Sequence, residues 1–143
     1  MQIAIASDHA GYELKEQLKR AFNDVAWLDL GTNSVESVDY PDFGFAMGAA
    51  ITEGRTRRGI VICGSGIGIS IAANRFPAVR AALCANATMA RLSRQHNDAN
   101  VLALGSRIVG FELARDCVRA FLDTAFEGGR HQKRIDMLGR PEV

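Results

Sequence analysis

The strongest constraint on the fold is a regular alternation of short apolar runs with segments of helical periodicity. Five runs have the length of strands, at residues 3–6, 25–30, 59–63, 80–84 and 100–104. Helical spacing of apolar residues occurs at 12–22, 45–51, 69–74, 87–94 and 111–126, and the basic tail is again helical through residue 138. This alternation is typical of βαβ units, whose parallel strands are covered by helices on both faces. We expect an α/β fold: a three-layer α/β/α sandwich with a Rossmann-like five-stranded parallel sheet.

Length and composition predict one domain over residues 1–143, because a chain of this size corresponds to about one folding unit. No internal repeat or linker occurs, and neither a basic leader nor an apolar run of about 20 residues is present. The expectation is a cytoplasmic protein without a membrane partner. The three cysteines form no C-x-x-C pair, so they do not support a metal site, a redox motif or a disulfide framework.

Net charge is +1, which argues against a nucleic-acid partner. The charge is unevenly distributed: residues 1–54 hold nine acids and three bases, whereas residues 55–94 hold seven arginines and no acid. Arginine suits bidentate binding of phosphate or carboxylate. Two interpretations stay open, namely a small anionic ligand or solvated arginines that pair with the acidic first third.

Ligands of open parallel sheets lie outside the carboxyl ends of the strands. This rule selects three polar stretches as candidate ligand positions: residues 7–9 after the first strand, 63–66 after the third, and 95–98 before the last.

The glycine-rich loop Gly64-Ser65-Gly66-Ile67-Gly68 lies between an expected strand and an expected helix. It is not the dinucleotide fingerprint G-x-G-x-x-G, because Ile69 occupies the last glycine position, and it lacks the G-K-[ST] of a Walker loop. Either a tight turn or a cradle of backbone N–H groups for an anion fits this pattern.

Cys63 directly precedes this loop. A cysteine at the end of an apolar strand is commonly a core residue, but N–H groups that converge at a helix start would favour its thiolate. Cys84 and Cys117 lie in apolar periodic segments and are expected in the core. In the tail, Arg130 and Arg134 are four residues apart, so on a helix they would share one face and could clamp a phosphate, or simply form a solvated helix end.

Six segments together resemble type B ribose-5-phosphate isomerase and its galactose- and allose-phosphate isomerase relatives, over almost the whole chain. They are Ser7-Asp8-His9-Ala10-Gly11, Asp39-Tyr40-Pro41, Cys63-Gly64-Ser65-Gly66-Ile67-Gly68, Ser93-Arg94-Gln95-His96-Asn97-Asp98, Gly105-Ser106-Arg107 and Gly128-Gly129-Arg130-His131. The resemblance implies an aldose–ketose isomerase (an intramolecular oxidoreductase) that forms a cis-enediolate and uses neither metal nor cofactor. It implies a homodimer or homotetramer with the active site at the subunit interface, and a phosphorylated sugar as substrate.

The resemblance also assigns roles residue by residue. Cys63 corresponds to the base that moves the proton between C1 and C2, and Ser65 would assist proton movement between O1 and O2. Some relatives use a Glu six positions after the strand-end residue as base, and here that position is Ile69. Asp8 and His96 resemble the pair that opens the furanose ring. The remaining expected contacts are the amides of residues 64–68 (Gly64, Gly66, Ile67 and Gly68 with Ser65) as the anion hole, Asn97 and Tyr40 at the sugar oxygens, His9, Arg130 and Arg134 at the phosphate, and Arg107, which could come from the partner subunit.

The favoured substrate is ribose 5-phosphate, converted to ribulose 5-phosphate in the pentose phosphate pathway. Allose or galactose 6-phosphate and a tetrulose phosphate stay open as alternatives. From other classes, a non-catalytic sugar-phosphate or nucleotide-binding module and a hydrolase with Cys63 as nucleophile are the rivals.

Overall fold

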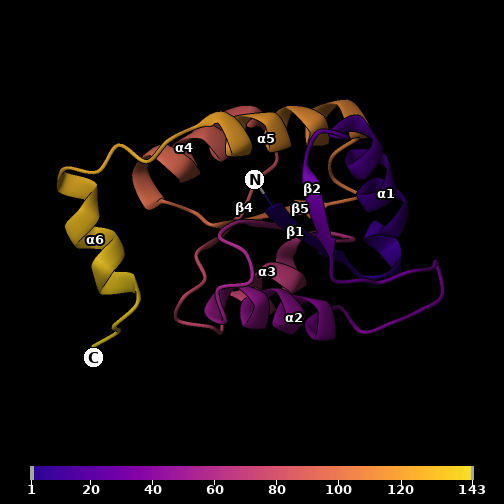
Figure 1. The fold of residues 1–143 in the computed structure, drawn as a ribbon, viewed down its shortest axis with the longest axis horizontal. Coiled ribbons are helices and arrows are strands. Elements are labelled where there is room, and N and C mark those ends of the chain that lie inside the picture. Colours follow the sequence, from indigo (N-terminus) through magenta and orange to yellow (C-terminus); the bar gives the residue numbers. More distant parts are fainter. Residues whose placement is uncertain (1, 143) are drawn as a thin grey trace.

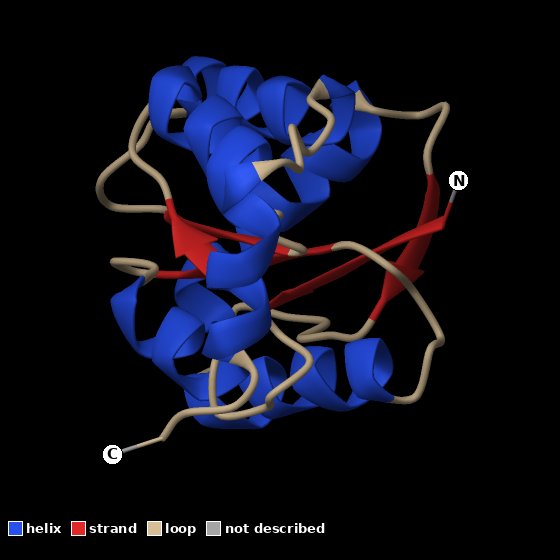
Figure 2. Cartoon of the chain, turned by 90° about the vertical axis from the view of Figure 1, so that its left-hand side faces the viewer, coloured by secondary structure: helices blue, strands red, loops and turns tan. Residues whose placement is uncertain are grey.

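The computed structural model describes residues 2–142, which form one parallel five-stranded sheet between two layers of helices (Figures 1 and 2). The strand order is β2-β1-β3-β5-β4, and every neighbouring pair is parallel. The predicted fold class is therefore confirmed. The elements are β1 (Gln2–Ser7), a 3-10 turn (His9–Gly11), α1 (Tyr12–Ala21), β2 (Ala26–Asp29), α2 (Tyr40–Thr52), β3 (Gly59–Cys63), α3 (Ile67–Ala73), β4 (Ala81–Leu83), α4 (Ala87–Asn97), β5 (Val101–Gly105), α5 (Phe111–Asp123) and α6 (Arg130–Leu138).

The three central strands β1, β3 and β5 send alternate side chains into two separate cores. In β3, Ile60 and Ile62 pack with α1, α4 and α5, whereas Val61 and Cys63 pack with α2 and α3. Successive side chains of a strand point to opposite faces, and a parallel sheet covered on both sides needs apolar residues at each position. Every residue of β3 and of β5 is accordingly buried.

The carboxyl-terminal ends of two helices differ by three residues from the expected ones. Helix α4 runs to Asn97, three residues beyond the predicted end, and stops where Asp98 adopts a left-handed conformation with φ of 44°. As a result His96 and Asn97 belong to a helix rather than to a loop. Helix α5 ends at Asp123, three residues before the predicted end, and an extended segment then leads to α6.

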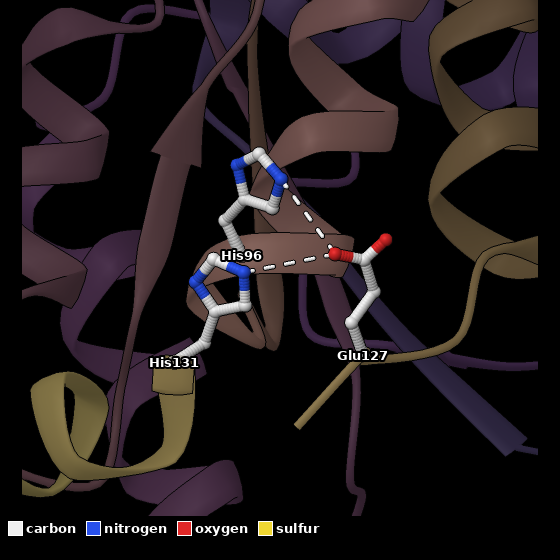
Figure 3. A group of neighbouring side chains, drawn as sticks. All are labelled: His96, Glu127 and His131. Atoms are coloured by element: carbon white, nitrogen blue, oxygen red, sulfur yellow. Dashed lines mark ion pairs between the residues drawn. The ribbon is translucent and has the colours of Figure 1, made fainter. Parts of the chain in front are cut away.

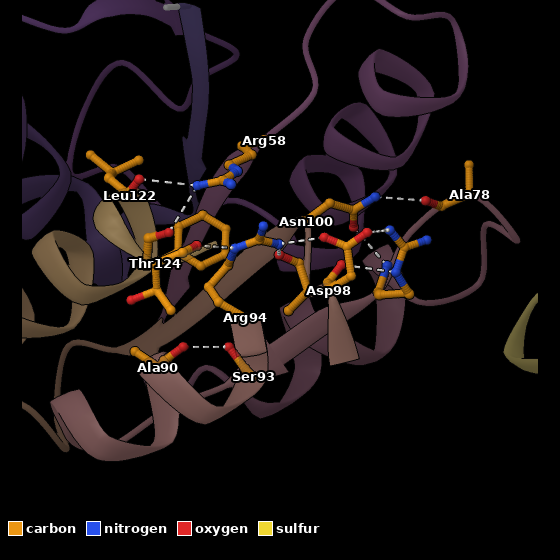
Figure 4. Close-up of polar contacts among 12 residues, drawn as sticks. Arg58, Ala78, Ala90, Ser93, Arg94, Asp98, Asn100, Leu122 and Thr124 are labelled. Atoms are coloured by element: carbon orange, nitrogen blue, oxygen red, sulfur yellow. Dashed lines mark hydrogen bonds and ion pairs between the residues drawn. The ribbon is translucent and has the colours of Figure 1, made fainter. Parts of the chain in front are cut away.

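Buried Arg94 connects the end of α4 to the segment that follows α5 (Figure 4). Its guanidinium donates to the carbonyls of Thr124 and Ala99 at 3.0 and 2.7 Å, and to Asp98 Oδ1 at 2.8 Å. Arg80 also pairs with Asp98. The expectation that arginines of residues 55–94 pair with the acidic first third is wrong for these two, because α4 supplies its own carboxylate at its end.

Helix α6 packs against α4 and projects from one side of the sandwich (Figure 1). Its last residues Met137 and Leu138 are about 60% exposed. Among residues 2–142, no helix combines the length and the apolar character that crossing a bilayer requires.

Replacing Arg94 with Met tests the buried connection. The change leaves two carbonyls and one carboxylate without their donor, so the free energy of unfolding is expected to fall by about 2–4 kcal/mol. Urea denaturation followed by circular dichroism measures it. The control is Arg91→Met, which removes an exposed arginine from the same helix and should change stability by less than about 0.5 kcal/mol. Equal effects of the two substitutions would contradict this account of Arg94.

Candidate active site

A cleft of about 620 Å³ opens at the carboxyl ends of β1 and β3. Its position agrees with the general rule for ligands of parallel sheets. Nine of the predicted site residues line it together: Asp8, His9, Tyr40, Cys63, Gly64, Ser65, Ile67, Gly68 and Arg107. Ala10, Ile71 and Ile108 complete the wall.

Cys63 lies at the inner end of the cleft and is 5% exposed. The backbone N–H of Gly66 donates to its Sγ at 3.2 Å. An N–H group aimed at sulfur stabilises negative charge there. The neighbouring amide of Ile67 donates to Ser65 Oγ at 3.1 Å. Two of the amides expected to form an anion hole therefore contact the side chains of Cys63 and Ser65 in this structure.

Gly66 allows the loop to turn from β3 into α3. Its φ is +78°, a conformation that side chains rarely adopt. A Cβ there would also lie 2.8 Å from the carbonyl carbon of Leu104 on the neighbouring strand. The glycine is thus required both by backbone conformation and by close packing. The same turn directs its amide at the sulfur of Cys63.

Asp8 and His9 follow β1 and are held by backbone groups. The Asp8 carboxylate, 6% exposed, accepts from the Gly11 amide at 3.1 Å and so caps the 3-10 turn. The Nδ1 atom of His9 accepts from the amide of Val38 at 3.1 Å. Because an acceptor nitrogen carries no proton, the neutral ring has its proton on Nε2 and can donate from that atom.

Tyr40 and Arg107 form two sides of the cleft. The Tyr40 ring lies against Gly68, where an added Cβ would meet its Cζ at 2.6 Å. The Arg107 guanidinium lies along Gly64, where an added Cβ would be 3.0 Å from its Nη1. Here Arg107 borders the cleft of its own chain, whereas the sequence left open that it comes from a partner.

Five predicted site residues do not line this cleft: Gly66, whose amide nevertheless donates to Cys63, and His96, Asn97, Arg130 and Arg134. The stretch 95–98 precedes β5, and β5 runs parallel to β3, so it lies at the amino edge of the sheet, opposite Cys63. Selecting this stretch by the carboxyl-end rule was wrong for that reason. Asn97 instead borders a second pocket, with Arg80 and Leu138, while Arg130 and Arg134 lie exposed on α6.

At that opposite edge, His96 of α4 stacks on His131 of α6 (Figure 3). The ring centroids are 4.6 Å apart and the planes differ by 14°. Glu127 Oε1 lies 3.8 Å from His96 Nε2 and 3.6 Å from His131 Nε2. Burial lowers the pKa of His131, and the positive charge of Arg130 lowers it further.

Three potential metal ligands meet in this group, within 4.8 Å of one another. Ring nitrogens bind metals along directions in the ring plane. Because the two planes are nearly parallel, the rings do not converge on one ion, and this arrangement fits proton sharing better than metal binding. Sequence reasoning missed Glu127 and singled out His131 only as part of a motif. The one sequence signal was the proximity of Glu127 to Arg130-His131 in the chain.

Comparison with known proteins agrees with this geometry. Residues 3–138 match the family model described as Ribose/Galactose Isomerase. Ribose-5-phosphate isomerase B of Escherichia coli (strain K12) is 47% identical over 139 residues, which cover 96% of this chain and 93% of that protein.

Two solved structures are also similar. Ribose-5-phosphate isomerase B of Clostridium thermocellum superposes with a TM-score of 0.95 at 52% identity, covering 97% of this chain and 95% of that one. The Mycoplasma genitalium enzyme of the same name was solved with bound ribulose-5-phosphate. It superposes with a TM-score of 0.92 at 42% identity, covering 97% of this chain and 94% of that one. The chain therefore belongs to the Ribose/Galactose Isomerase family.

Proposed function

We propose that this protein interconverts the aldose and ketose forms of a sugar phosphate, with ribose 5-phosphate and ribulose 5-phosphate as the principal pair. The observation that carries the proposal is the Cys63 thiol, held in a cleft beside Ser65 and Asp8 with an N–H group aimed at its sulfur. The family match over residues 3–138 and the ribulose-5-phosphate complex of a relative support the same substrate class. We also propose that it acts in the pentose phosphate pathway, to which this substrate pair belongs, and in the cytoplasm.

In the proposed reaction, the Cys63 thiolate removes a proton from the carbon beside the carbonyl and returns it to the adjacent carbon. Negative charge moves onto the two sugar oxygens as the cis-enediolate forms. Ser65 Oγ, which accepts from the Ile67 amide, would pass a proton between these oxygens. Backbone donors that face such a charge contribute about 2.7–4 kcal/mol each in related acyl-transfer sites. Ile69 is fully buried, so the position where some relatives place a carboxylate base is part of the core.

Cys63 is the cysteine suited to this role. Burial raises the pKa of Cys84 to about 12 and that of Cys117 to about 11, so both remain thiols at neutral pH. Both lie in the core on the other face of the sheet. The three cysteines are unpaired, in keeping with a reducing compartment.

We infer that the active site is completed by a second copy of the chain. His96, Asn97, Arg130 and Arg134 have proposed roles in ring opening and in sugar and phosphate binding, yet they lie at the edge opposite the cleft of their own chain. Several apolar side chains are exposed beside the cleft and on α4 and α6, as expected of a subunit interface: Ile67, Ile71, Met89, Leu92, Met137 and Leu138. In a symmetric dimer, α6 of one chain can reach the cleft of the other.

Alkylation tests the difference between the cysteines. Iodoacetamide at pH 8 should modify Cys63 and leave Cys84 and Cys117 intact in the folded protein, because only thiolates react. Peptide mass spectrometry locates the adduct, and the loss of activity should follow its formation. Saturating sugar phosphate should slow the reaction. Modification of Cys84 or Cys117 before Cys63 would contradict the assignment.

Replacement of Cys63 by Ala tests the proposed base. Loss of a positioned base typically costs 10²–10⁴-fold, so kcat should fall by about 10³-fold. Incorporation of deuterium from heavy water into the sugar should fall equally, whereas Cys117→Ala should retain both. Wild-type protein is assayed with four-, five- and six-carbon sugar phosphates to identify the substrate. A binding module would show no exchange with any of them, and a Cys63→Ala variant that keeps a tenth of wild-type kcat would refute the role of Cys63.

Mixing inactive variants tests the shared site. A Cys63→Ala chain and an Arg130→Ala/Arg134→Ala chain are denatured together and refolded at equal concentrations. If each site uses Cys63 of one chain and the arginines of the other, half of the dimers carry one intact site. About one quarter of wild-type activity should then return, by the two-fold symmetry of such dimers. Activity no higher than that of the parents would show that each site lies within a single chain.

A further inference from the structure

Glu127 and His131 both contact His96, and neither has a role in the reaction described above. Both Nε2 atoms face the same carboxylate oxygen of Glu127, at 3.8 Å from His96 and 3.6 Å from His131. Figure 3 shows the second ring nitrogen of His96 on the opposite side of the ring, pointing away from Glu127. The three side chains come from α4, from the segment after α5, and from α6.

The backbone holds this group in place. The amide of Glu127 donates to the carbonyl of Gln95 at 3.1 Å, which ties the carboxylate to the residue next to His96. The amide of His131 donates to the carbonyl of Gly128 at 3.1 Å. Two residues before His96 in α4, Arg94 donates to the carbonyl of Thr124. The backbone of Glu127 is therefore held next to His96.

The two imidazole rings cannot easily carry a proton each. Their centroids are only 4.6 Å apart, so two imidazolium ions would repel, while Glu127 can neutralise one of them. His131 is 7% exposed, and its Nε2 has no hydrogen-bond partner among the described residues. The pKa of His131 is lowered by burial and by three neighbours, Arg130, His96 and Arg134. The negative charge of Glu127 acts in the opposite direction and raises it. The side chain of His96 is 41% exposed, so water can reach that ring, whereas the ring of His131 is buried.

We propose that Glu127 and His131 are positioning residues that keep one proton on His96 and orient its Nδ1 as the donor for sugar ring opening. Glu127 faces Nε2 and keeps that nitrogen protonated in both charge states. His131 stays neutral and holds the ring by stacking. This inference rests on the proposed function, in which His96 acts with Asp8 of the neighbouring chain.

Ring opening breaks one bond and moves two protons. The bond between C1 and the ring oxygen breaks, and that oxygen takes the proton from His96 Nδ1. The C1 hydroxyl loses its proton to the Asp8 carboxylate, and its electrons form the C1 carbonyl. His96 is left neutral with its proton on Nε2, toward Glu127. Nothing is oxidised or reduced from outside.

Only the aldose needs this step. In a ketopentose 5-phosphate, the C5 oxygen is esterified, so no furanose ring can close onto C2. The exchange of a C1 proton of that ketose uses Cys63 and the groups around it, and it does not require ring opening. A defect in His96 protonation should therefore slow turnover of the aldose and spare exchange in the ketose.

The test compares Glu127→Gln with Asp136→Asn, which removes the same charge from an exposed position on α6. For Glu127→Gln, kcat with ribose 5-phosphate should fall by about ten-fold, the scale of a lost charged interaction. Deuterium exchange at C1 of ribulose 5-phosphate should stay within two-fold of wild type. Asp136→Asn should match wild type in both. Glu127→Asp, which keeps the charge, should recover part of the aldose rate.

A proton titration gives a readout independent of turnover. The chain has three histidines, so the His96 ring signal can be followed by NMR and assigned with a His96→Gln variant. Without the Glu127 carboxylate, the imidazolium of His96 is less stable and its titration midpoint should fall by about one pH unit. The pH at which the aldose rate declines should fall with it.

Several results would overturn the inference. One is a His96 midpoint that does not change in Glu127→Gln, and another is an equal loss of aldose turnover and ketose exchange. Failure of the proposed function is separate, because wild-type protein would then show no C1 exchange with any sugar phosphate.

Discussion

Burial of β3 on both faces is the constraint from which the rest of the structure follows. Because the strand is covered by α1, α4 and α5 on one side and by α2 and α3 on the other, its residues must be apolar until the sheet ends. Cys63 is the last residue of the strand, and the loop that follows it lines the polar cleft. A thiol is the side chain that satisfies both conditions, since it packs like a small apolar group and can also carry charge. The dense core next to it fixes the direction of the sulfur.

The same topology divides the proposed chemistry between two edges of the sheet. Groups that follow β1 and β3 meet in the cleft, whereas residues 95–98 come before β5 and lie at the other edge. No rotation of a side chain can join them within a chain. The proposed second subunit would join them without any change of fold, through helix α6, which projects from the sandwich (Figure 1). Under this proposal, assembly is a condition for activity.

Sequence patterns predicted the cleft well and the opposite edge poorly. The Cys63 loop was recognisable because strand, glycine spacing and helix start are all local features. The sequence suggested that His96 lies at the same edge of the sheet as Cys63. It lies at the opposite edge, because it precedes β5 and that strand runs parallel to β3. Buried Lys15 illustrates a second limit. It lies within an amphipathic helix, yet it is fully buried and donates to Asp29 Oδ1 and the Thr32 carbonyl, both at 2.7 Å. Such partners are distant in sequence and leave no periodic signal.

What the sequence by itself determined is the layer architecture, the strand that ends in Cys63, and the glycine loop after it. These depend on hydrophobic periodicity and backbone conformation, which act between residues close in the chain. Only the tertiary structure decided that Glu127 and His131 surround His96, and that Arg94 anchors Thr124. Those contacts join α4, α5 and α6 across the helical layer. They arise from packing between elements, for which no short-range pattern exists.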